Sequence, residues 1–123
     1  MAARELWSLP ADTPRGWQSA DKKWSQLEFR GLNLTAGNHP VMIEIEAKCG
    51  RFDIANVAWA AGDGFKAGRE MEFIAGYPGA EYPTYRITIA SGGRPITALR
   101  LRFPAQAEVD LRAVRILELN LLP

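Results

Sequence analysis

Short runs of apolar and β-branched residues recur along the chain at intervals of roughly ten residues, separated by glycine, proline, asparagine and aspartate. No window keeps a sustained helical period. Such spacing is typical of an all-β sandwich or barrel, with antiparallel pairing because the connections are too short for crossover helices. The predicted strands run from Gln26 to Leu34, Val41 to Lys48, Phe52 to Trp59, Arg69 to Ile74, Tyr85 to Ala90, Thr97 to Phe103 and Val109 to Leu119.

Alternation within these runs predicts which side of each strand is buried. Val41, Ile43, Ile45 and Ala47 alternate with mostly polar residues, so they face the core. The same rule points two further groups of side chains in opposite directions. The inward group is Leu99, Leu101, Phe103, Met71, Phe73, Tyr85, Ile87 and Ile89, and the outward group is Arg86, Thr88, Arg100, Arg102, Glu70 and Glu72.

Two strands change their alternation partway along. The phase slips near Gly31, where Phe29 gives way to Leu32, and near Ala113, where Leu111 gives way to Val114. An extra residue in one strand of a pair shifts the alternation in this way, so each position predicts a β-bulge.

Cys49 and Gly50 predict a tight hairpin turn between the second and third strands. If these two residues form the turn, Ile45 lies opposite Ile54 and Trp59 falls on the outer face. Simple alternation gives Trp59 the same face as Asp53, Ala55 and Val57. Asn56 then falls among the inward positions, where an amide is unusual.

The composition favours an ordinary globular protein. The 123 residues suit one β-sandwich domain spanning 1–123, either a short protein or a module of a longer one. Apolar residues make up 47% and charged residues 24%, which argues against a disordered or membrane-inserted chain. With 15 Lys and Arg against 14 Asp and Glu the net charge is +1, so nucleic acid is not an expected partner.

Cys49 is the only cysteine, so the chain has no internal disulfide, and no neighbouring Cys or His suggests a metal site. No cofactor is predicted, although a structural calcium ion at a loop edge stays open. The segment Met1 to Glu5 leads directly into charged sequence rather than into a cleavable hydrophobic segment. We therefore expect no signal peptide, and a cytoplasmic location if the chain is complete.

Several segments together resemble a known family: Val57 to Trp59, the Gly64-Phe65 turn, Tyr85 to Ile87, and Leu99 to Pro104 followed by Val109 to Ile116. They look like galactose-binding-like modules, the jelly-roll domains that bacteria append to glycosyltransferases and other polysaccharide-processing proteins. Family members commonly follow the leucine-arginine strand with Asp-Pro and Gly, whereas Ala105 to Ala107 stand here. The resemblance implies an antiparallel two-sheet jelly roll, a non-catalytic role and a carbohydrate ligand.

Sugars present apolar C–H faces and a fringe of hydroxyl groups, so a glycan site needs an exposed aromatic ring beside hydrogen-bonding groups. Trp59 would be such a platform, with carboxylates beside it and guanidinium groups as donors. Two alternatives stand: Trp59 fills the core, and the arginines pair across strands with Glu70 and Glu72. The candidate ligand-binding residues are Trp59, Asp53, Glu44, Glu46, Arg86, Arg100 and Arg102.

A second candidate cluster lies in loops and near strand ends: Trp17, Trp24, Tyr77 and Tyr82. Ligands also bind at edges that loops build. The alternative is that Trp7 and Trp17 plug the core from the N-terminal segment.

Catalytic machinery is not evident. His39 stands alone in a turn before Pro40, without a nucleophile pattern beside it. Glycoside hydrolysis needs two carboxyl groups at a defined separation, which Glu44, Glu46, Glu70 and Glu72 could supply, and replacing Glu44, Glu46 and Asp53 is its test. We expect no enzyme, but a non-catalytic carbohydrate-binding module. The alternative is a structural or interaction module that packs against a catalytic domain of the same parent protein.

Overall fold

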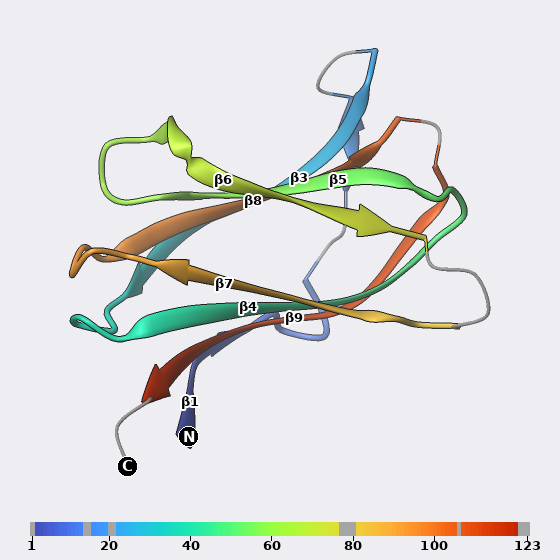
Figure 1. Cartoon of the computed structure of the whole chain (residues 1–123). Coiled ribbons are helices and arrows are strands. Elements are labelled where there is room, and N and C mark those ends of the chain that lie inside the picture. The colour runs from blue at the N-terminus through green and yellow to red at the C-terminus, as the bar shows by residue number, and fades with distance from the viewer. Residues whose placement is uncertain (1, 14–15, 20–21, 77–80, 106, 121–123) are drawn as a thin grey trace.

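The computed structural model describes residues 2–13, 16–19, 22–76, 81–105 and 107–120, and it forms two antiparallel β-sheets that face each other (Figure 1). One sheet has the strand order β1-β9-β4-β7 and the other β2-β3-β8-β5-β6. The strands are β1 Ala2–Ser8, β2 Gln18–Ser19, β3 Trp24–Leu34, β4 Pro40–Cys49, β5 Asp53–Ala60, β6 Phe65–Ala75, β7 Thr84–Ala90, β8 Ile96–Pro104 and β9 Val109–Asn120.

The all-β, two-sheet prediction is confirmed, and the seven predicted strands correspond to β3 through β9. Strands β1 and β2 were not predicted. β1 lies at the edge of its sheet and pairs only with β9, so few of its side chains need to be apolar. Within the described ranges, no helix is long and apolar enough to span a membrane.

From β3 to β5, and again from β6 to β9, the chain alternates between the two sheets, as Figure 1 shows. The predicted hairpin between the second and third strands is therefore wrong. β4 pairs with β7 and β9, whereas β5 pairs with β6 and β8. Residues 50–52 cross between the sheets, and the Gly50 N–H donates to the Glu108 carbonyl at 2.9 Å during the crossing.

This crossing also reverses the predicted faces of β5. Ala55, Val57 and Trp59 point into the core, and Trp59 is only 7% exposed. Asn56 instead lies on the outer face, opposite Glu72 on β6 and Arg102 on β8. The amide that looked out of place among inward positions thus belongs to the polar face of the sheet.

The inward alternation predicted for β4, β7 and β8 is confirmed, because every one of those predicted inward side chains is buried. Met71 lies on the predicted side of β6, opposite the buried Val57, but its side chain is 43% exposed because β6 is an edge strand. Phe73 does pack inward, with its ring centroid 5.0 Å from that of Tyr85 and 5.9 Å from that of Phe103. Each fully buried aliphatic or aromatic side chain contributes about 1.5–3 kcal/mol.

Both predicted bulges are present. The register of β3 against β8 shifts between Arg30 and Leu34, where Gly31 has φ 75°. In β9, Glu46 of β4 pairs with Ala113 but Ala47 pairs with Leu111, so Arg112 is the extra residue. The bulge restores the inward direction of Val114 beyond it.

Candidate functional site

The structure separates the predicted site residues. Trp59 lies between the sheets, so it is core and cannot be an exposed platform, which corrects that prediction. Five of the other six residues lie on the two opposite outer faces of the sandwich, whereas Asp53, at the start of β5, is on the same side of its strand as Ala55 and pairs with the buried Ala75. Glu44, Glu46 and Arg86 belong to strands of the four-stranded sheet, and Asp53, Arg100 and Arg102 to strands of the five-stranded sheet.

On the four-stranded sheet, the Glu44 carboxylate binds two arginine side chains. It accepts hydrogen bonds from Arg86 Nε at 2.8 Å and Arg115 Nε at 2.9 Å, and also from Arg115 Nη2. Burial by itself would raise the pKa of Glu44, but these hydrogen bonds and the positive charges of Arg86 and Arg115 outweigh it and lower the pKa. The hollow around Glu44 has a volume of about 210 Å³.

Arg100 and Arg102 reach in opposite directions across the five-stranded sheet. Arg102 Nε donates to Gln26 Oε1 of β3 at 3.1 Å, whereas Arg100 Nη2 lies 3.7 Å from Glu70 of β6. The Arg100 guanidinium also stands 4.7 Å from the centroid of the Phe65 ring. The alternative that these arginines pair across strands with glutamates holds for Arg100, which pairs with Glu70. Arg102 instead donates to the side-chain amide oxygen of Gln26.

A larger cavity, about 420 Å³, opens at the end of the five-stranded sheet where β5 begins and β6 ends. These two strand ends lie on the right in Figure 1. We call this cavity the Trp24 cavity. Trp24 opens β3 opposite Pro104 of β8, and the Ala105 N–H donates to the Lys23 carbonyl at 2.7 Å. The lining residues are Lys22, Lys23, Trp24, Arg51, Asp53, Ile54, Glu72, Pro104 and Ala105.

The Trp24 cavity combines apolar surface with hydrogen-bonding groups. The half-buried Trp24 supplies a ring and Ile54 an aliphatic surface that is 41% exposed, next to Ile74, its partner on β6. Asp53 accepts from the Ile54 N–H at 2.7 Å and pairs with Arg51 at 3.2 Å. A concave site of this kind, apolar with a few placed polar groups, suits a small polar ligand with apolar faces.

No protein-family model and no curated protein matches the sequence. Solved structures do match over nearly the whole chain. The CBM1 module of BiXyn10A superposes with a TM-score of 0.62 at 7% identity, covering 92% of this chain and 97% of that one. The CBM6 module of Cellvibrio mixtus lichenase 5A, solved in complex with cellotriose, gives 0.63 at 12% identity, covering 95% and 100%.

A third match is the C-terminal CBM6 module of LamC, a marine laminarinase from Zobellia galactanivorans. Its TM-score is 0.57 at 12% identity, over 94% of this chain and 90% of that one. The chain has the jelly-roll fold of carbohydrate-binding modules. At these identities the likeness concerns the fold alone, and the ligand must be argued from the site.

The described residues of the second predicted aromatic cluster do not come together either. Trp17 packs edge-on against Phe103 with ring centroids 5.6 Å apart, and Trp7 packs on Phe29 at 5.6 Å, so the alternative that both plug the core is confirmed. Tyr82 donates to Asp110 on β9. Trp24 lines the cavity, and Tyr77 lies outside the described residues.

The cavity could not be assembled from the sequence. Its residues come from the starts of β3 and β5 and the ends of β6 and β8, which become neighbours only through the sheet order. Trp24 follows Lys22 and Lys23 and precedes Ser25 and Gln26, and this polar surrounding was a signal for an aromatic ring at a polar strand end. Ile54 was predicted to point inward, so its contribution to an outer surface was missed.

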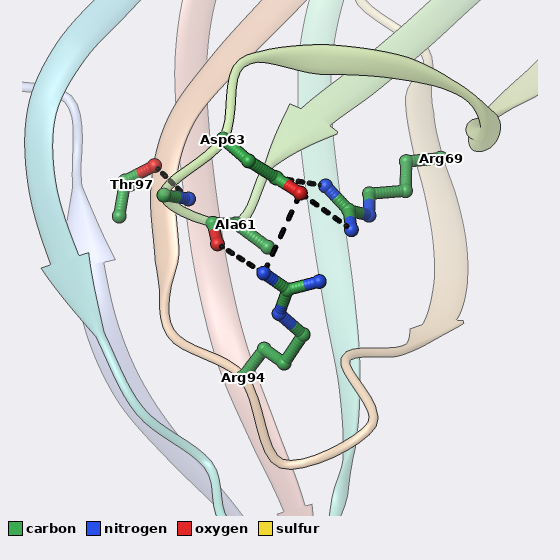
Figure 2. Close-up of polar contacts among 6 residues, drawn as sticks. Ala61, Asp63, Arg69, Arg94 and Thr97 are labelled. Carbon is green, nitrogen blue, oxygen red and sulfur yellow. Dashed lines mark hydrogen bonds and ion pairs between the residues drawn. The ribbon is translucent and has the colours of Figure 1, made fainter.

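Polar groups of the Gly62-Asp63-Gly64 turn after β5 form hydrogen bonds and ion pairs with other residues of the chain (Figure 2). The Gly62 N–H donates to Thr97 Oγ1 at 2.9 Å, and Arg94 Nη2 donates to the Ala61 carbonyl at 3.2 Å. Asp63 accepts from Arg69, whose hydrogen bond lowers the pKa of Asp63. This turn is a structural corner at the end of β5 opposite the Trp24 cavity.

Metal ligands do not converge in the described part of the chain, where no group of three or more His, Cys, Asp or Glu side chains could hold an ion. His39 Nδ1 lies 3.5 Å from Glu118, a carboxylate that also accepts from Arg4 at 3.0 Å. This arrangement resembles a surface charge cluster more than a catalytic pair.

Proposed function

We propose that this chain is a non-catalytic carbohydrate-binding module that binds its glycan in the Trp24 cavity. The observation that carries the proposal is the joining of an indole ring, an exposed Ile54 and hydrogen-bonding groups in one cavity of about 420 Å³. This volume lies within the range of about 300–1,000 Å³ typical of ligand sites. The shared fold supports it, as does the cellotriose complex of one structural neighbour.

The chemistry of a pyranose ring fits this lining. Its C–H face packs on Trp24 and Ile54, where burial of apolar area is favourable. Its hydroxyl groups donate to the carboxylates of Asp53 and Glu72 and accept from Arg51. Because the polar groups border the apolar surface, a sugar matches the site better than an apolar protein surface does.

A non-catalytic role agrees with the positions of the carboxylates. The hydrolase alternative requires two of the candidate carboxyl groups to face each other in a cleft. Glu44 and Glu46 border the hollow on the four-stranded sheet, whereas Asp53 lines the Trp24 cavity on the five-stranded sheet. A sugar bond held beside Asp53 is therefore out of reach of Glu44 and Glu46, and Asp53, which shares the cavity with Glu72, is already bound by Arg51 and by the Ile54 N–H.

The experiment is a calorimetric titration of the protein with soluble oligosaccharides and polysaccharides, repeated with Trp24→Ala and Asp53→Asn. We expect Trp24→Ala to weaken binding at least about tenfold, as for a central aromatic contact worth more than about 1.4 kcal/mol. Glu46→Gln is the matched control, since it changes a carboxylate on the other sheet. Absence of binding to every glycan, or an unchanged affinity of a folded Trp24→Ala, contradicts the proposal.

A further inference from the structure

The outer side of β3 continues beyond the Trp24 cavity. Trp24 is followed on this side of the strand by Gln26, Glu28 and Arg30, because the residues between them, such as the buried Leu27, alternate inward. We call Gln26, Glu28 and Arg30 the β3 strip. At about 3.4 Å per residue, Arg30 lies about 20 Å along the strand from Trp24. The strip is therefore long enough to contact parts of a ligand that extend out of the cavity.

A second hollow lies along the strip. Its volume is about 310 Å³, and it is lined by Gly16, Gln26, Leu27, Glu28 and Arg30. Gln26 is the next outward residue after Trp24, so the second hollow and the Trp24 cavity are neighbours along β3. Both volumes fall within the range of about 300–1,000 Å³ typical of ligand sites. A ligand longer than one cavity can occupy both.

Hydrogen bonds hold the strip together along the strand. Glu28 accepts from Gln26 Nε2 at 3.1 Å through one carboxylate oxygen and from Arg30 Nε at 2.9 Å through the other. Gln26 accepts from Arg102 Nε of β8 at 3.1 Å, and the Arg30 guanidinium lies 5.7 Å from the centroid of the Phe65 ring. Side chains of a sheet commonly pair across strands, whereas Glu28 bonds to both of its neighbours on β3 itself. This ordering lowers the entropic cost of binding a ligand along the strip.

The strip also keeps hydrogen-bonding groups for a ligand. A carboxylate has about four acceptor positions, and an amide nitrogen or a guanidinium has more than one N–H donor. The contacts of Glu28 with Gln26 and Arg30 use only part of this capacity, and the Arg30 side chain is 70% exposed. Donors and acceptors alternate along the strip. Sugar hydroxyl groups fit such a row, since each of them can both donate and accept.

We infer that the ligand is an internal stretch of a linear polysaccharide, which runs from the Trp24 cavity along the β3 strip. This inference rests on the proposed function and specifies its ligand class. One sugar unit packs in the Trp24 cavity, and the following units lie over the second hollow. Their hydroxyl groups bond to Gln26, Glu28 and Arg30. A single sugar leaves the strip uncovered.

The test measures how affinity depends on chain length. The protein is titrated calorimetrically with cello-, laminari- and xylo-oligosaccharides, each series from the monosaccharide to the hexasaccharide. In at least one series we expect the dissociation constant to fall about tenfold or more between the disaccharide and the hexasaccharide, because the added units reach further hydrogen-bonding groups. Equal affinity for the disaccharide and the hexasaccharide overturns the extended site but leaves glycan binding intact.

Arg30→Ala tests whether the added units lie on the strip. It should weaken the hexasaccharide roughly threefold to tenfold, the loss of about one hydrogen bond, and leave the disaccharide unchanged. Arg4→Ala is the matched control, because the Arg4 side chain is 66% exposed and donates to Glu118 at 3.0 Å on the other sheet. It should change neither affinity. An unchanged hexasaccharide affinity in Arg30→Ala, or an equal loss for the disaccharide, overturns the extended site.

The two proposals fail in different ways. If none of the three series binds but another glycan does, the linear chain along β3 is wrong and the proposed function stands. If no glycan of any kind binds, both proposals are wrong.

Discussion

Gly76, the residue directly after β6, faces the backbone of Arg51 so closely that an added Cβ would stand 2.6 Å from the Arg51 carbonyl carbon. Gly76 has φ 78°, a conformation that favours glycine, and its N–H donates to the Tyr85 hydroxyl at 2.8 Å. The segment that crosses between the sheets is thereby packed against the end of β6. Since Arg51 and Asp53 line the Trp24 cavity, the shape of the cavity depends on this contact.

Gly76→Ala should therefore reduce both stability and glycan affinity. We expect a loss of about 2 kcal/mol or more in the free energy of unfolding, because strained φ and backbone overlap add. Urea denaturation and titration with the bound glycan measure the two effects. Gly68→Ala is the matched control, with φ 89° but nothing within 4 Å of its Cβ. Equal losses in the two variants contradict a role for the Arg51 contact.

Trp59 should matter for stability and not for binding. Trp59 lies in the core cluster, opposite Leu99 of β8, so Trp59→Ala should cost about 3–5 kcal/mol. Trp59→Phe retains much of the apolar volume and should stay folded at a smaller cost. Titration of Trp59→Phe with glycan should give the affinity of the unsubstituted protein. If a folded Trp59→Phe variant binds glycan more weakly, Trp59 takes part in binding and this prediction is wrong.

The pH dependence of stability should report Glu44. Its pKa is lower in the folded protein than the usual 4.5, so between these two pKa values the unfolded chain binds more protons. The stabilisation by Glu44 is complete above about 4.5 and is lost as the pH falls through the folded value. Urea denaturation of the protein and of Glu44→Gln across this range should show the two stabilities converging toward acid.

Glu46→Gln provides the comparison for that measurement. Glu46 pairs with the exposed Arg112 at 3.3 Å, and exposed pairs contribute about 1 kcal/mol or less. Glu44→Gln should be the more destabilising near neutral pH, by about 1–3 kcal/mol, since it weakens hydrogen bonds to both Arg86 and Arg115. A stability gap that persists unchanged at low pH contradicts this account of Glu44.

Local alternation predicted most strands and their buried sides, because one face of each strand must be apolar wherever it meets the core. It failed at β5, where the buried side had been inferred from a pairing with β4. The run from Val57 to Ala60 is apolar on both sides of the strand, so alternation within it could not select the buried side. β5 belongs to the five-stranded sheet because it pairs with β8, a strand far away in the sequence. Local patterns cannot predict such a pairing, for example that of Val57 with Leu101.

The same limit applies to the site. Asp53 was selected because alternation gives it the same face as Trp59, yet it lines a cavity with Trp24, which precedes it by 29 positions. Arg86, Arg100 and Arg102 were correctly placed outside, but which outer face each occupies follows from the strand order. Residue types indicated which kinds of side chain a glycan site needs. The strand order decided which side chains line the Trp24 cavity.

Asp63 should stabilise its turn without affecting the ligand. It accepts from Arg69 and lies 3.5 Å from Arg94, beside the Gly62 N–H that donates to Thr97 (Figure 2). Asp63→Asn weakens both ion pairs, so local opening of residues 61–64 should become more frequent. Hydrogen exchange followed by NMR should show faster exchange of the Gly62 amide. Glycan affinity should stay unchanged, since β5 separates this turn from the Trp24 cavity. An affinity loss as large as that of Trp24→Ala would place the glycan at this corner of the sandwich instead.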